Sequence, residues 1–108
     1  MTQSEFRLIF ADQVNKCEET LRMKKKEYTG DREDRLSAFR IAASLQDCTP
    51  QRALVGMMAK HIVSLYDMCY AKNTSFTKEL WDEKITDSLN YLCLLAAIIK
   101  EEGTYEQN

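Results

Sequence analysis

Apolar residues recur at intervals of three and four positions along most of the chain, which is the period of an amphipathic α-helix. Residues 3–28 form the first such segment. Gly30 follows as a natural helix end, because glycine readily adopts the left-handed conformation common there. Asp31 is well placed to cap the next helix. The stripe that we expect to face a core consists of Phe6, Phe10, Val14, Cys17 and Leu21.

Three further segments repeat this pattern and predict helices over residues 32–46, 50–71 and about 77–102. The start of the third helix is marked by Thr49-Pro50, because threonine caps a helix and proline suits its first position. The residues expected to face inward are Leu36, Phe39 and Ala43 in the second helix, and Leu54, Met58, Ile62, Leu65 and Cys69 in the third.

Four helices joined by short connections predict an all-α fold, an antiparallel four-helix bundle formed by residues 1–108 as one domain. The fourth helix is apolar nearly all round from Tyr91 to Ile99. A domain of this size can seldom bury such a surface alone, so we also expect a homo-oligomer.

Composition and charge narrow the class of protein. The formal net charge of −2 does not suggest a nucleic-acid binder. We interpret the basic run Arg22, Lys24, Lys25 and Lys26 as the solvated end of a helix. The four cysteines lack metal-ligand spacing, and no apolar run approaches the length of a membrane span, so we predict a cytoplasmic protein with reduced thiols and no membrane partner.

Three polar residues interrupt the apolar fourth helix. Glu83, Asp87 and Asn90 are spaced four and three apart, so their side chains share one side of it. Carboxylates that share a helical face can hold Mg²⁺, a cation that prefers oxygen ligands. The alternative is that Glu83 is a solvated surface acid and the other two have structural hydrogen-bond partners.

The third helix carries a second polar edge, formed by Lys60, Ser64 and Asp67 at spacings of four and three, and His61 lies next to Lys60 among apolar residues. Lys60 could reach a carboxylate on the fourth helix or a ligand phosphate. His61 is either a hydrogen-bonded core residue or a ligand-binding one. Whether this edge faces Asp87 cannot be derived from the sequence.

The turn between the first two helices contains Tyr28, Gly30 and Asp31. Its structural interpretation is a helix stop followed by a cap. Its functional interpretation is a loop whose tyrosine ring and carboxylate reach a nucleotide or its metal.

Scattered motifs over residues 20–100 form a recognisable order. They are Lys24, Tyr28, Gly30 and Asp31, then Phe39 with Ala42, Thr49-Pro50, Met57-Met58 with Lys60, and Trp81 to Tyr91. In this order they resemble small helical proteins of phages and prophages, including a nucleotide-modification-associated group, and they are similar to the all-α nucleotide pyrophosphohydrolases of the MazG type.

The resemblance implies Mg²⁺-dependent hydrolysis of nucleoside triphosphates, with ligands from an EExxE segment and an ExxD segment. Glu83 and Asp87 would then be metal ligands, and Lys60 would act with them in catalysis by neutralising phosphate charge. Tyr28, Asp31, Lys60, His61 and Asn90 would bind the nucleotide. This chain departs from the pattern, because Glu83 and Asp87 are four residues apart and Arg22 replaces the last acid of a segment that begins at Glu18-Glu19.

Three hypotheses follow. The first is a phage-type, MazG-like protein that binds a nucleotide and, with Mg²⁺, cleaves it in the cytoplasm of a bacterial host. The second is a non-enzymatic accessory or anti-defence protein that binds a host protein or sequesters a nucleotide; the departures in spacing favour it. The third is an oligomeric scaffold without a ligand.

Overall fold

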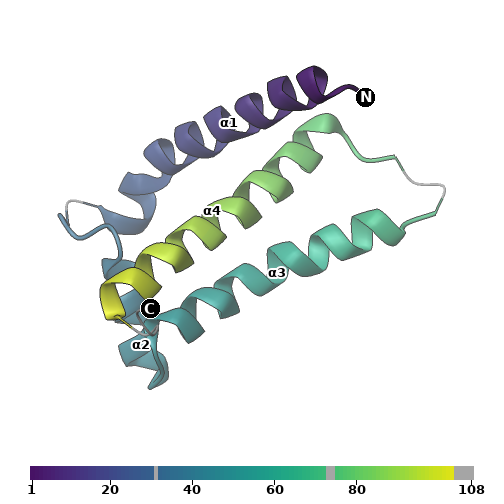
Figure 1. Cartoon of the computed structure of the whole chain (residues 1–108). Helices are drawn as coiled ribbons and strands as arrows, with labels where there is room; N and C mark the ends of the chain where they lie inside the picture. The colour runs from purple at the N-terminus through teal and green to yellow at the C-terminus, as the bar shows by residue number, and fades with distance from the viewer. Residues whose placement is uncertain (31, 73–74, 104–108) are drawn as a thin grey trace.

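The computed structural model describes residues 1–30, 32–72 and 75–103, apart from the side chains of residues 26 and 28. Within these ranges the chain forms four α-helices and no strand (Figure 1). The prediction of an all-α fold is therefore confirmed for the described residues. None of these helices is long and apolar enough to cross a membrane. The helices are α1 (Gln3–Thr29), α2 (Ser37–Gln46), α3 (Pro50–Tyr70) and α4 (Lys78–Glu102).

The helix ends follow the local chemistry of the sequence. The Thr49 hydroxyl accepts a hydrogen bond from the Arg52 backbone N–H at 3.3 Å, and Thr77 accepts one from Leu80 at 3.1 Å. Both threonines satisfy backbone donors that the first helical turn leaves without a partner. At the other end of α4, Gly103 adopts a left-handed conformation with φ of 62°.

The second helix begins at Ser37, five residues later than the predicted start at residue 32. The Asp34 carboxylate accepts a hydrogen bond from the Leu36 backbone N–H at 3.0 Å. Aspartate often bonds the backbone two residues further on, and this arrangement favours a turn over a helix. The segment that leads into α2 is therefore a turn.

Helix α4 lies between α1 and α3 (Figure 1). Gln13 bonds Thr86 and Asn90 bonds Cys17, so residue numbers rise together along α1 and α4 and the two helices are parallel. Helix α3 runs in the opposite direction. The predicted antiparallel arrangement is wrong for this pair, because the ten-residue α2 is too short to return the chain along the length of α1.

The main core lies at the end of the molecule that contains α2. Its buried residues are Leu36, Phe39, Leu54 and Ile98, contributed by α3, α4, α2 and the turn before α2. The sequence places the first three of these inward, and the structure confirms that. Removing such side chains from water is the main favourable contribution to folding.

The predicted core stripe of α1 is largely exposed, contrary to expectation. Phe6, Phe10 and Val14 have exposed fractions of 51%, 61% and 46%. The reason is that α1 packs mainly on α4, and no helix covers its other side in this part of the molecule. The radius of gyration is 16.1 Å, against about 13 Å for a compact chain of this length.

Candidate functional site

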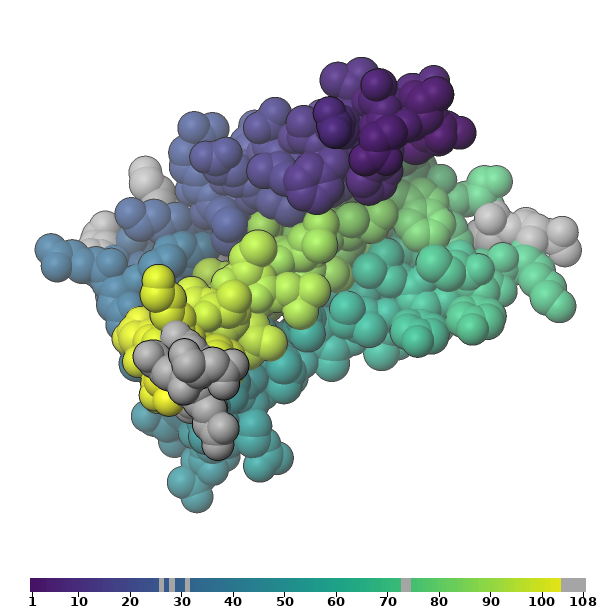
Figure 2. Space-filling model, in the orientation of Figure 1, coloured from purple at the N-terminus to yellow at the C-terminus, as the bar shows by residue number. Residues whose placement is uncertain are grey.

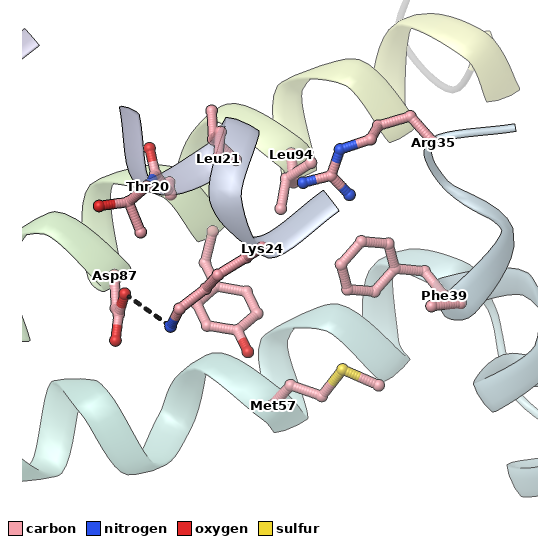
Figure 3. A pocket seen from close by; sticks show the side chains of 11 residues that line it. Thr20, Leu21, Lys24, Arg35, Phe39, Met57, Asp87 and Leu94 are labelled. Atoms are coloured by element: carbon pink, nitrogen blue, oxygen red, sulfur yellow. Dashed lines mark hydrogen bonds and ion pairs between the residues drawn. The ribbon is translucent and has the colours of Figure 1, made fainter. Parts of the chain in front are cut away.

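A partly buried charge pair joins α1 to α4, on the part of α4 that also faces α3. The Lys24 ammonium of α1 is 3.3 Å from Oδ1 of Asp87 on α4, and the Asp87 side chain is 8% exposed (Figure 3). On the other side, Nδ1 of His61 from α3 is 3.8 Å from Oδ2 of the same carboxylate. The structure thus brings two of the candidate residues, Asp87 and His61, together.

His61 is a neutral imidazole at physiological pH. Burial lowers the pKa of His61 below its ordinary value of 6.5, and the nearby ammonium groups of Lys84, Lys60 and Lys24 lower it further. The Asp87 carboxylate opposes them, but its effect is smaller than that of burial. The imidazole also packs against the Tyr91 ring, with 5.4 Å between centroids.

This pKa shift predicts a loss of stability on acidification. The folded state binds the His61 proton less well than the unfolded chain does. The contribution of His61 to the free energy of unfolding is therefore fully present above pH 6.5, the ordinary pKa, and is lost as the pH drops through the lower pKa of the folded state. The melting temperature should therefore fall between pH 7 and pH 5. Since His61 is the only histidine of the chain, His61→Gln should flatten the profile in this window; an unchanged slope would contradict the assignment.

A cavity of about 160 Å³ lies beside the charge pair. Its wall is contributed by α1, α2, α3, α4 and the turn before α2 (Figure 3). Most of the wall surface is apolar, although polar and charged side chains from α1, α4 and the turn before α2 also border the cavity. The lining residues are Thr20, Leu21, Lys24, Arg35, Ala38, Phe39, Met57, Asp87, Asn90, Tyr91 and Leu94.

Two lining residues carry buried polar atoms without a hydrogen-bond partner. Asn90 is 5% exposed; its amide N–H donates to the Cys17 carbonyl oxygen at 3.1 Å, while its own Oδ1 accepts no bond. Nη2 of Arg35 is likewise buried without an acceptor. Buried polar groups almost always have partners, so these two atoms leave one acceptor and one donor beside the cavity that the described residues do not satisfy.

Arg35 is held in place from α1. Thr29, fully buried at the end of α1, accepts a hydrogen bond from Nη1 of Arg35 at 3.4 Å, and its hydroxyl lies 3.4 Å from the Arg35 carbonyl oxygen. The guanidinium then extends over the cavity toward the Phe39 ring (Figure 3). The second nitrogen, Nη2, has no acceptor among the described residues.

The other predicted site residues lie apart from this cavity. Glu83 is exposed and borders a shallower cleft between α1 and α4, which Asp87 also borders. Lys60 is exposed on α3. The Tyr28 side chain and Asp31 lie outside the described residues.

The pair of carboxylates predicted to hold Mg²⁺ does not fit a metal site well. Lys24 already neutralises Asp87, and an ammonium at 3.3 Å occupies the space that a cation would need. Among the described residues, no three histidine, cysteine or acidic side chains cluster closely enough to hold a metal ion.

Several cavity residues were missed by the sequence analysis, above all Lys24 and Arg35. Lys24 was assigned to a solvated helix end, although it lies seven residues after Cys17 and so on the side of α1 that faces α4. Arg35 carries no motif that would mark it, because the turn that aims it depends on contacts with α1.

Comparison with known proteins identifies no relative. No family model matches the chain, and neither the curated proteins nor the solved structures include a significant match. The resemblance to MazG-type proteins therefore stays a hypothesis.

Proposed function

We propose that the cavity binds a nucleotide, with the base inside and the phosphates toward solvent. The observation that carries this proposal is the pair of buried, unpartnered polar atoms on the wall of an apolar cavity, Asn90 Oδ1 and Arg35 Nη2. A nucleobase supplies ring or amino N–H groups that can donate to Asn90 Oδ1. Its carbonyl oxygens, or the phosphate oxygens of the nucleotide, can accept from Arg35 Nη2.

The size and charge of the cavity support the same class of ligand. Its volume is close to the ~150 Å³ of an apolar cavity known to hold one benzene ring. Lys24 and Arg35 together carry two positive charges against the single negative charge of Asp87, which favours an anionic ligand. The Lys24 side chain is 36% exposed, so a phosphate can approach it from solvent.

The test compares two arginines that differ in their contact with the cavity. Arg35→Gln should weaken nucleotide binding about 10-fold or more, since a charge-assisted hydrogen bond contributes roughly 1.5–3 kcal/mol. Arg32→Gln removes the same charge from an exposed neighbour and should change binding little. Titration calorimetry with a panel of purine and pyrimidine nucleotides would measure both. If no nucleotide binds, or if both variants bind alike, the proposal fails.

A cavity-filling variant separates binding from folding. Ala38→Leu places a larger side chain into the cavity from α2 and should abolish nucleotide binding while the helical circular dichroism persists.

Cleavage of the bound nucleotide with Mg²⁺ is a second candidate. Glu83 and Asp87 both border the cleft between α1 and α4, and Asp87 also borders the cavity, which supports cleavage, whereas the Lys24 pairing favours binding without cleavage. Release of pyrophosphate from a nucleoside triphosphate in the presence of Mg²⁺, lost in Glu83→Gln, would favour the enzyme. Binding without turnover would favour sequestration.

A further inference from the structure

The long helices form a single layer with one side left open. Helices α1, α4 and α3 lie side by side, and α2 lies behind this layer at one end (Figure 1). Figure 2 shows α4 open between α1 and α3 along most of its length. A layer of amphipathic helices needs a second layer to bury its apolar side. Along most of their length, α1, α4 and α3 have no such second layer from the described residues on the open side.

The open side is apolar. Ile85, Leu89 and Leu92 are 36%, 37% and 49% exposed, and helical spacing places them on the side of α4 opposite Asp87 and Leu94. The exposed stripe of Phe6, Phe10 and Val14 on α1 extends this face, which we call the open face. These six residues include no charged side chain.

The exposed area exceeds what a monomer of this mass presents. The accessible surface is 8261 Å², whereas a folded monomer of 12.6 kDa exposes about 6,200 Å². The excess of about 2,000 Å², summed over the whole molecule, is larger than the ~800 Å² that each partner contributes to a standard interface, so the chain has enough surplus surface to form one.

We propose that the open face binds the open face of a second copy of this chain. A two-fold interface brings the same patch of both subunits together, so the patch must complement itself. An uncharged apolar face meets this condition without like-charge repulsion. Pairing two such layers would give the two-layer helical packing that one chain lacks.

The experiment measures the molar mass of the full chain by light scattering at micromolar concentrations. The wild type should have at least twice 12.6 kDa. Phe10→Glu and Leu92→Glu each bury a charge in the interface and should shift the protein to the monomer. Leu45→Glu is the matched control: Leu45 is apolar and 82% exposed, but it lies on α2, and this variant should keep the wild-type mass.

A monomeric wild type would overturn the proposal, and so would open-face variants that keep the wild-type mass. Should a glutamate variant lose its helical circular dichroism, Phe10→Ala and Leu92→Ala replace it. Melting temperature then reports association, because the transition of a dimer rises with protein concentration. This dependence should be present in the wild type and in Leu45→Glu and weaker in the alanine variants; equal dependence in all four would overturn the proposal.

Discussion

Asp87→Ala should destabilise the protein by about 2 kcal/mol, because it leaves the Lys24 ammonium without its buried counter-charge. Removing one partner of a fully buried ion pair costs more, about 3–5 kcal/mol. The smaller figure applies because Lys24 is partly exposed and retains some hydration. Urea unfolding followed by circular dichroism would measure the change.

The double variant Asp87→Ala with Lys24→Met provides the control. The double variant removes the ammonium together with the carboxylate that it faces, so it should recover much of the lost stability. If the double variant loses as much unfolding free energy as Asp87→Ala and Lys24→Met lose in sum, the two side chains do not interact as described. A stable Asp87→Ala protein that loses nucleotide binding would instead assign Asp87 mainly to the ligand.

Leu54→Ala should cost about 2–5 kcal/mol, the range for a leucine truncated in a packed core. Leu54 is 0% exposed and packs with Leu36, Phe39 and Ile98, so its removal opens a void among three helices and a turn. The midpoint of urea unfolding should fall accordingly. The slope of the transition should not change, since the exposed area is nearly the same.

Leu45→Ala is the matched control for this prediction. It removes the same atoms from a side chain that is 82% exposed and should change stability by less than about 0.5 kcal/mol. If Leu54→Ala and Leu45→Ala lost similar amounts of unfolding free energy, Leu54 would not lie in the core as described.

The helices could be predicted from the sequence because their ends depend on neighbouring residues. Thr49 caps the third helix, as Thr49-Pro50 predicts, whereas Ser75 and Thr77 both suit the start of the fourth helix by their residue type; the structure shows that Thr77 caps it. The start of α2 could not be predicted as well, because acids before a helix suit both a first turn and a capping turn. The hydrogen bond from the Leu36 N–H to Asp34 decides between them.

The candidate site was only partly predictable. A carboxylate among apolar residues needs a partner, so Asp87 could be singled out from its surroundings in the sequence. Its partner could not, because Lys24 lies 63 residues away and only the packing of α1 on α4 joins them. Arg35 and the cavity depend on the same long-range contact and on the turn before α2.

The open face shows where helical periodicity stops being informative. The spacing of Phe6, Phe10 and Val14 predicts that they share one side of α1. It does not predict whether another part of the same chain covers that side. In the structure α1 packs mainly on α4, and no described helix covers the side that carries these three residues (Figure 1).

The parallel pairing also has a kinetic consequence. Gln13 and Thr86 are separated by 73 residues, whereas α2, α3 and α4 contact one another in sequence order. Ordering a chain loop of that length costs entropy before any contact compensates it, so α1 should dock last and detach first. Hydrogen exchange should then be faster in α1 than in α3.

Because Thr20, Leu21 and Lys24 form one wall of the cavity, local release of α1 would open a path for a ligand while the core around Leu54 stays folded.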